Sequence, residues 1–281
     1  MKEILSAENA QYKLLGKLLK AKKYRHQENS YLAEGLNFLD IPVERVKAYL
    51  LASSNRQKVK EWNLPEEKVI LLSDSLFKEL SQDPASQGLI VWTMMQDHQW
   101  HGNWELDCSK RESLNRQKND KEEEDRDTPL YLALEDIQDA GNMGTMLRTA
   151  EAAGVTAVFC SSRCVDLYHP KVVKAAASSL SRLRIYTDCD LPSIVRAAQE
   201  KGVFCYASTP VRAEEYSRVD YSKPSLFLIG NEGNGLSDEI FAVAEGRIYI
   251  PMSGEIESLN AAISAAILLY EAKRQRSLIK I

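Results

Sequence analysis

The sequence predicts an α/β fold in two parts, of which the C-terminal one is built on a mostly parallel sheet. Strand-like and helix-like patterns alternate along the chain, and a charged stretch separates a shorter alternating region from a longer one. In the longer region, three polar loops that contain glycine each follow an apolar strand. These observations divide the chain into residues 1–106, 107–127 and 128–281.

Composition indicates a globular protein that does not cross a membrane. A chain of 281 residues with 44% hydrophobic residues can bury a core, and its net charge of −4 is ordinary. No apolar stretch reaches the length of a membrane-spanning helix. Lys2, Glu3 and Glu8 interrupt the region where a secretory signal would be apolar, so we expect a cytoplasmic protein.

The cysteines are odd in number and include no C-x-x-C pair, so they predict neither a disulfide framework nor a zinc site. We expect thiols and no bound metal. The five cysteines are Cys108, Cys160, Cys164, Cys189 and Cys205.

The first part of the chain carries a local basic excess. Residues 1–60 contain 12 Lys and Arg against 6 Asp and Glu, whereas residues 61–106 contain 2 against 8. Affinity for phosphate groups is therefore expected on the first segment. Its first helix is expected to begin at a Ser6 cap and to carry an apolar stripe from Tyr12 to Leu19. Strands are then expected at Val46–Leu51, Val69–Leu72 and Gly88–Met94, and helices at Gln57–Asn63 and Asp74–Leu80.

Residues 107–127 contain 14 charged residues of 21 and almost no apolar periodicity. Such a segment is typical of a solvated linker or a mobile insertion. After it, strands are expected at Leu130–Leu134, Thr156–Cys160, Leu183–Tyr186, Val203–Ser208, Ser225–Ile229 and Arg247–Pro251. Helices are expected at Thr145–Ala153, Lys171–Ser179, Leu191–Lys201, Asp238–Ala244 and Leu259 to about Arg276.

The first polar loop lies between the strand ending at Leu134 and a helix that stops at Gly154. Gly141 and Gly144 allow close approach of a ligand, and Arg148 can point a fixed guanidinium at a phosphate. An ordinary turn with a surface arginine explains the same residues.

The second loop contains three glycines around Asn231 and Glu232, and Ser237 can cap the helix that follows. A phosphate-binding loop is disfavoured, because no Lys-Ser or Lys-Thr follows the glycines and Glu232 would repel phosphate. A carboxylate here suits a hydroxyl group, an amino group or the positioning of a catalytic partner. A tight Asn-Gly turn is the structural alternative.

The third loop follows the strand near Ile250 and leads into a helix rich in alanine. The alanines allow close packing of a buried helix. Ser258 and Asn260, at the start of that helix, are harder to explain by packing alone. Since ligands gather at the carboxyl ends of parallel strands, the three loops are expected to meet at one edge of one sheet.

Three runs of residues carry a family resemblance: N-M-G-T-M-L-R-T-A-E-A-A-G, L-I-G-N-E-G-N-G-L-S, and I-P-M-S-G-E-I-E-S-L-N-A-A-I-S-A-A-I-L-L-Y-E. In order and spacing they resemble the signature motifs of the SpoU (TrmH-like) RNA 2′-O-ribose methyltransferases of the SPOUT superfamily. The likeness covers roughly residues 128–275. It implies an α/β knot (a deep trefoil) with a mostly parallel sheet, S-adenosylmethionine as methyl donor, and a homodimer.

The resemblance also implies site residues. The cofactor would be held largely by backbone groups at Gly230, Asn231, Ile250, Met252 and Leu259. Arg148 would be the leading catalytic residue, and the residues that organise it and the ribose would be Asn142, Glu232, Ser258 and Asn260.

The 2′-hydroxyl is a weak nucleophile, so its proton must be removed while oxygen, carbon and sulfur are held in line. Arginine is normally locked in its protonated form. The base is therefore left open between a phosphate, a water and an unusually perturbed arginine, and Arg148 can instead anchor the adjacent phosphate.

The N-terminal run E-N-S-Y-L-A-E-G-L-N-F-L resembles the L30e-like substrate-binding domain of many family members, over about residues 6–95. RNA is the implied partner. Candidates for backbone contacts are Lys22, Lys23, Arg25 and His26, with Arg148 in the second part. Ribosomal RNA is favoured over transfer RNA as substrate by analogy of fold alone.

Two departures from the family pattern bear on substrate preference, namely Ala140 where Pro is frequent and Ser178 near a frequent Gly. Two other functions stay open. One is an RNA-binding protein whose methyltransferase domain no longer turns over. The other is a nucleotide-phosphate enzyme, which tight binding of ATP but not S-adenosylmethionine would support.

Overall fold

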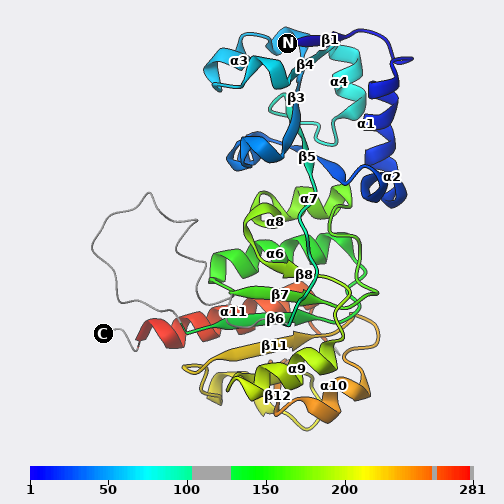
Figure 1. The fold of residues 1–281 in the computed structure, drawn as a ribbon. Helices are drawn as coiled ribbons and strands as arrows, with labels where there is room; N and C mark the ends of the chain where they lie inside the picture. The colour runs from blue at the N-terminus through cyan, green and yellow to red at the C-terminus, as the bar shows by residue number, and fades with distance from the viewer. Residues whose placement is uncertain (103–127, 255–257, 279–281) are drawn as a thin grey trace. The chain divides into compact units, whose positions relative to one another are not determined.

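The computed structural model describes residues 1–102, 128–254 and 258–278. These residues form two compact units (Figure 1). The first unit contains residues 1–97 and 166–181, and the second contains the described residues of 98–165 and 182–281. The charged segment expected at 107–127 lies outside the described residues.

The first unit is built on a five-stranded mixed sheet in the order β1-β4-β3-β5-β2. β1, β4 and β3 are parallel, and β5 pairs antiparallel with β3 and β2. The three expected strands have nearly the predicted bounds, as β3, β4 and β5, while β1 and β2 were not expected. The strands are β1 (Lys2–Ile4), β2 (Ser30–Glu34), β3 (Val46–Ala52), β4 (Val69–Leu72) and β5 (Leu89–Met94).

Helices α1 (Ala10–Lys20) and α4 (Asp74–Leu80) share one hydrophobic core with this sheet. Leu15 and Leu18 of α1 are buried there, as the apolar stripe predicts. The cap of α1 is Asn9, whose side chain accepts hydrogen bonds from two backbone amides of the first turn, so the prediction of a Ser6 cap is wrong. The remaining elements of this unit are α2 (Lys22–Gln27), α3 (Lys58–Glu61), α7 (Pro170–Ala176) and 3₁₀ helices at Leu36–Asp40, Val43–Arg45, Ser53–Asn55 and Glu66–Lys68.

The second unit is built on a seven-stranded sheet in the order β10-β12-β9-β11-β6-β7-β8, in which every pairing is parallel. This confirms the mostly parallel sheet. The strands are β6 (Leu130–Leu134), β7 (Ala157–Cys160), β8 (Ile185–Tyr186), β9 (Phe204–Ser208), β10 (Glu214–Glu215), β11 (Ser225–Ile229) and β12 (Gly246–Tyr249).

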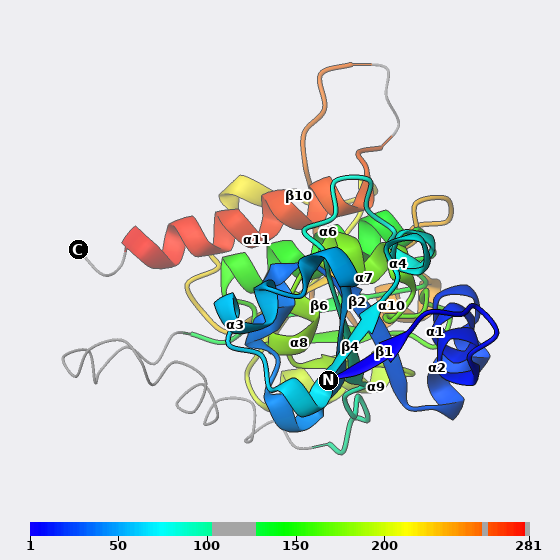
Figure 2. The ribbon, with the colours of Figure 1, turned by 90° about the horizontal axis from the view of Figure 1, so that it is seen from above.

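Helices α9 (Leu191–Glu200) and α10 (Asp238–Val243) pack on one face of this sheet, against alternate residues of the central strands such as Tyr131 and Leu226. Helices α6 (Ala140–Ala153) and α11 (Ala261–Leu278) pack against each other, away from α9 (Figure 2). Ala261, Ala262 and Ala265 of α11 are buried as expected, and Ala266 is half-buried. A 3₁₀ helix covers Tyr216–Arg218 in this unit, and α8 (Ser179–Arg182) begins in the first unit, whose second segment ends at Ser181.

Two helix boundaries differ from the prediction for local reasons. Helix α6 begins at Ala140 and not at Thr145, because the Asp139 side chain accepts a hydrogen bond from the Asn142 amide and caps the helix five residues earlier. The helix expected over Lys171–Ser179 is divided at Ala177, whose φ of 50° and ψ of −140° are not helical. Across the described ranges, no helix combines the length and apolarity that a bilayer crossing needs.

Candidate active site

The three glycine-containing loops lie at the carboxyl edge of the parallel sheet, as the sequence predicts. Two of them follow β6 and β11, which are neighbouring parallel strands paired from Leu130–Ser225 to Leu134–Ile229. The third follows β12 and leads to α11. The arrangement places the ends of three strands and the starts of two long helices around one set of polar side chains.

A chain of hydrogen bonds joins one residue from each loop. The amide of Asn260 donates from Nδ2 to Oδ1 of Asn142 at 2.9 Å, and Asn142 donates from Nδ2 to Oε1 of Glu232 at 2.5 Å. Because each amide group has one donor and one acceptor side, this chain fixes the orientation of both asparagines. The structure thus brings together three of the five predicted catalytic residues.

Asn260 also caps α11. Its Oδ1 accepts hydrogen bonds from the amides of Ala262 and Ile263, at 2.9 and 3.2 Å. The same side chain therefore fixes the start of the helix and the orientation of Asn142. Ser258, the fourth predicted residue, is exposed two positions before this cap.

Arg148 lies on the exposed face of α6 with Gly141 and Thr145. Its guanidinium forms no hydrogen bond or ion pair with any residue in the described ranges. The helix thus presents the paired N–H donors of a guanidinium, which suit a phosphate or carboxylate group.

The loop from Gly230 to Ser237 is closed on itself. Asn231 and Gly235 exchange backbone hydrogen bonds of 3.1 and 2.9 Å, and the Asn231 side chain accepts from the amides of Gly233 and Asn234. A Cβ at Gly230 would lie 2.2 Å from the Gly235 carbonyl carbon, so no side chain fits there without moving the backbone. The glycine is required by this close approach.

The apolar residues implied for the cofactor lie on the chain between β12 and the Asn260 cap. Ile250 and Leu259 are half-buried, and the Met252 side chain is exposed at 37%. An adenine needs apolar contact on its faces, and a ribose needs amide or carboxylate partners. Exposed Met252 supplies apolar surface and exposed Glu232 supplies a carboxylate, so the residues present fit S-adenosylmethionine.

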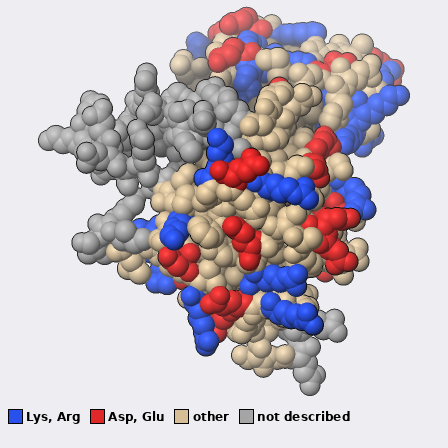
Figure 3. Space-filling view, turned by 60° about the horizontal axis from the view of Figure 1, so that its bottom comes forward, with Lys and Arg blue, Asp and Glu red and all other residues tan. Residues whose placement is uncertain are grey.

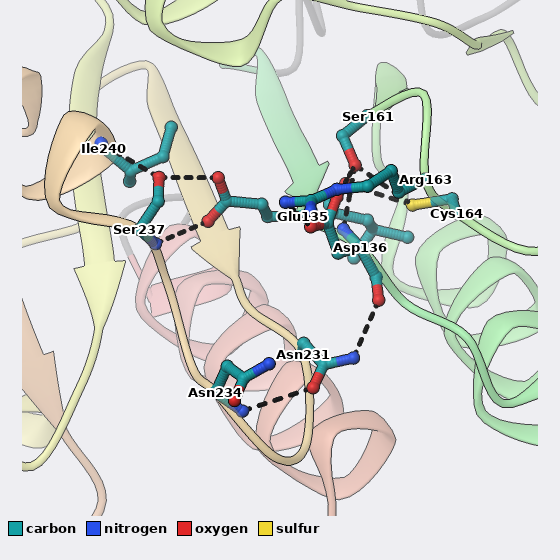
Figure 4. Close-up of polar contacts among 10 residues, drawn as sticks. Glu135, Asp136, Ser161, Arg163, Cys164, Asn231, Asn234, Ser237 and Ile240 are labelled. Carbon is teal, nitrogen blue, oxygen red and sulfur yellow. Dashed lines mark hydrogen bonds and ion pairs between the residues drawn. The ribbon is translucent and has the colours of Figure 1, made fainter.

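Four further residues at this edge, Glu135, Asp136, Ser161 and Arg163, were not predicted (Figure 4). Glu135 accepts from the Ser237 amide at 2.8 Å and from the Ser237 hydroxyl at 2.7 Å. Asp136 contacts Ser161 and Arg163, which follow β7, the next strand of the sheet. The polar residues that follow Cys160 could have indicated Ser161 and Arg163 from sequence, because β7 ends at the same edge of the sheet as β6.

Two thiols lie at the end of β7. Hydrogen bonding between them lowers the pKa of Cys164 and, together with burial, raises the pKa of Cys160. Cys164 also donates to the Leu134 carbonyl at 3.4 Å. Among the described cysteines, Cys160, Cys164, Cys189 and Cys205 are free thiols. No cluster of metal-ligating side chains occurs in the part of the chain that the structure describes.

The four predicted RNA contacts of the first unit all lie on α2, but they differ in exposure. Lys22, Lys23 and His26 are exposed. Arg25 is 3% exposed, and its guanidinium donates to the Asp166 carboxylate at 2.6 and 3.0 Å and to the Leu18 carbonyl. This corrects the expectation of a solvent-facing Arg25, because the buried arginine is held by partners within its own unit.

The surface charge is mixed. On the face drawn in Figure 3, basic and acidic side chains alternate, without one continuous basic field. This agrees with the net charge of −4. Contacts with a polyanion would therefore depend on particular side chains such as those of α2.

Two family models match the chain. The SpoU rRNA Methylase family matches residues 129–270, and the MRM3-like substrate binding domain matches residues 9–91.

Similar proteins carry related descriptions. An uncharacterized tRNA/rRNA methyltransferase of Synechocystis is 36% identical over 147 residues, and the match spans 52% of this chain and 54% of that protein. The 23S rRNA (guanosine(2553)-2′-O)-methyltransferase RlmP of Bacillus subtilis is 27% identical over 97% of this chain and 100% of its own length.

Among solved structures, the AdoMet-bound rRNA methyltransferase of Sinorhizobium meliloti matches with a TM-score of 0.76 and 25% identity, over 97% of each chain. SpoU methyltransferases have the trefoil-knot fold, and this match gives the chain the same α/β architecture. The loops that meet at the sheet edge all lie within the matched residues 129–270. The chain belongs to the SpoU rRNA methylase family.

Proposed function

We propose that the protein transfers a methyl group from S-adenosylmethionine to the 2′-oxygen of a ribose in RNA. The observation that carries this proposal is the hydrogen-bond chain from Asn260 through Asn142 to Glu232, which joins all three family motifs. When bound, S-adenosylmethionine supplies an electrophilic methyl carbon. The remaining task of the site is to hold the ribose oxygen in line with it.

Arg148 is the residue best suited to hold the RNA. Its guanidinium is exposed on a rigid helix and carries paired N–H donors, so it can bind the phosphate next to the target ribose with two hydrogen bonds. Glu232 faces the same loops with one carboxylate oxygen bonded to Asn142. It can accept a hydrogen bond from a ribose hydroxyl, with Ser258 as a further polar partner.

The cofactor is assigned to Gly230, Asn231, Ile250, Met252 and Leu259. The closed Gly230–Gly235 turn presents backbone groups in a fixed geometry, and Met252 presents an exposed apolar side chain. Rigid polar groups beside apolar contact surface are what a small-molecule site requires.

We propose ribosomal RNA as the substrate. The MRM3-like substrate-binding match over residues 9–91 and the named 23S rRNA relative both support it. Exposed Lys22, Lys23 and His26 are the proposed contacts to the RNA backbone. Transfer RNA is the alternative, because other relatives are named as methyltransferases of guanosine 18 in tRNA.

We propose a homodimer in the cytoplasm. Ile263 and Tyr270, which are 51% and 48% exposed, lie seven residues apart on α11 with half-buried Ile267 between them. This spacing places three large apolar side chains on one face of the helix. Light scattering should give twice the chain mass, and Ile263→Arg should give monomers, if that face is the interface.

The direct test is calorimetric titration with S-adenosylmethionine, S-adenosylhomocysteine and ATP. Saturable binding of the first two, and not of ATP, is expected. Binding of neither, even with RNA present, would favour an RNA-binding protein with a degenerate methyltransferase domain. Selective binding of ATP would point to a nucleotide-phosphate enzyme.

A further inference from the structure

We propose that Asp136 is a positioning residue that holds the Gly230–Ser237 loop in the shape that binds S-adenosylmethionine. The proposal rests on the proposed function, because it assumes that this loop contacts the cofactor. It assigns a role to a side chain that is not among the motif residues discussed above.

Asp136 is held in a conformation that few residues adopt. Its φ is +56°, in the left-handed region that aspartate, asparagine and glycine tolerate best. The Ser161 hydroxyl donates to Asp136 Oδ1 at 2.6 Å, and the Asp136 amide donates to the Ser161 oxygen at 2.8 Å. The two bonds clamp the side chain and the backbone of one residue to the same partner.

A third contact comes from Arg163, whose Nη2 lies 2.5 Å from Asp136 Oδ2. The Arg163 side chain is 78% exposed and that of Asp136 17%. An exposed ion pair stabilises a conformation only slightly, because water screens the charges and the arginine loses rotamer freedom. Ser161 is therefore expected to contribute more than Arg163 to holding Asp136 in place.

The backbone carbonyl of Asp136 contacts the Gly230–Ser237 loop. The carbonyl of Asp136 accepts a hydrogen bond of 2.9 Å from Nδ2 of Asn231. Asn231 uses its other side-chain atom, Oδ1, to accept from the amides of Gly233 and Asn234. The direction of the Asp136 carbonyl thus sets the orientation of the Asn231 amide group, and through it the turn (Figure 4).

The far end of the same loop is held by the preceding residue. Glu135 binds the Ser237 amide and hydroxyl, and its own amide donates to the Ile229 carbonyl at 2.9 Å. Consecutive residues after β6 therefore anchor both ends of the loop after β11. This leaves the loop preformed, so less ordering is needed when a ligand binds.

Three variants separate the contributions of the side chain. Asp136→Gly removes the carboxylate but tolerates the positive φ, whereas Asp136→Ala removes the carboxylate and adds backbone strain. Asp136→Asn keeps an acceptor for the Ser161 hydroxyl and loses only the charge, so it should retain affinity for S-adenosylmethionine. We expect Asp136→Gly to raise the Kd for S-adenosylmethionine about tenfold, the effect of losing one half-buried polar anchor. Asp136→Asn should stay within about threefold, as should Arg163→Ala.

The second readout needs no ligand. In the ligand-free protein, Asp136→Gly should speed hydrogen exchange of the Gly233 and Gly235 amides, both of which bond to Asn231. A merely structural role would instead lower the melting temperature and speed exchange throughout the sheet. A double-mutant cycle tests whether Asp136 acts through Asn231. If it does, Asp136→Gly should change the Kd of the Asn231→Ala protein less than about twofold.

Glu151→Gln is the matched control, since Glu151 also pairs with an arginine, Arg182, but at the opposite end of α6. It should leave both the Kd and the exchange of the loop amides unchanged. A wild-type Kd with normal loop protection in Asp136→Gly would overturn this proposal while leaving the proposed function intact. Absence of binding by the wild-type protein would instead count against the proposed function, and the exchange experiment would still decide whether Asp136 holds the loop.

Discussion

The Asn142 amide donates a 2.5 Å hydrogen bond to the Glu232 carboxylate, across 90 residues of sequence. This bond joins the helix that carries Arg148 to the loop assigned to the cofactor. Since Asn260 bonds to the other side of the same amide, Asn142 is the residue through which all three loops are aligned.

Asn142→Ala should lower turnover about a hundredfold, because it releases both Glu232 and Asn260 and a small misplacement of reacting groups costs rates of this order. The melting temperature should change little, since the three side chains lie at the surface. Methyl transfer kinetics would measure the effect. Gln138→Ala, an exposed change in the same loop, is the control, and equal rates for the two variants would remove Asn142 from the site.

Gly230→Ala should abolish binding of S-adenosylmethionine. The added Cβ would lie 2.2 to 2.5 Å from backbone atoms of Gly235 and Leu236, and backbone cannot yield as a flexible side chain can. Titration calorimetry would measure the loss. Gly254→Ala adds the same methyl group where no atom of the described residues lies within 4 Å, and it should bind normally. Wild-type affinity in Gly230→Ala would show that the loop is not as tightly closed as described.

Tyr221→Phe should stabilise the protein by about 1 kcal/mol, because a buried hydroxyl without a partner carries a desolvation penalty. Tyr221 is fully buried, and its hydroxyl has no hydrogen-bond partner among the described residues. The ring contacts with Tyr206 and Phe227 are retained by phenylalanine. Urea unfolding would measure the change.

Tyr12→Phe is the comparison for Tyr221→Phe. The Tyr12 hydroxyl contacts the Leu76 carbonyl and the Glu79 carboxylate at 3.0 and 2.9 Å, so its loss should destabilise the protein by about 1 kcal/mol. A change of the same sign in the free energy of unfolding of both variants would contradict this explanation.

Stability should fall with rising pH partly because of one thiol. Burial raises the pKa of Cys205 from its ordinary value of 9.0 to about 12. The contribution of this thiol to the free energy of unfolding is therefore fully present below pH 9. It is lost as pH rises from 9 toward 12, because the thiol is then ionised in the unfolded chain but still protonated in the folded one. Cys205→Ala should make this decline shallower by about 1.4 kcal/mol per pH unit.

Urea unfolding between pH 8 and 11 measures that slope. An identical slope in wild type and Cys205→Ala would show that the Cys205 thiol does not titrate as described.

The sequence predicted those features that depend on local pattern. Leu130–Leu134, Ser225–Ile229 and Asp74–Leu80 have the predicted bounds, because apolar runs and capping residues define them. The meeting of three loops at one edge followed from the parallel order of the strands. The strand and helix bounds follow from local sequence, and the meeting of the loops follows from a general rule for parallel sheets.

Features that depend on tertiary contacts were not predicted. Nothing near Arg25 indicates that it is buried, since Asp166, its partner, lies 141 residues away. The choice of Asn9 over Ser6 as helix cap, and the left-handed backbone of Asp136, are likewise decided by surroundings that periodicity does not report. The roles of individual site residues follow from such contacts.

The measurement that tests the central claim most directly is transfer of a labelled methyl group from S-adenosylmethionine to ribosomal RNA taken from a strain lacking this protein. We expect label in one 2′-O-methylated nucleoside after digestion. Arg148→Ala should bind S-adenosylmethionine as wild type does but transfer no label, because its guanidinium serves the RNA side of the site. Label on a base, or transfer spared in Arg148→Ala while cofactor affinity is lost, would contradict the account.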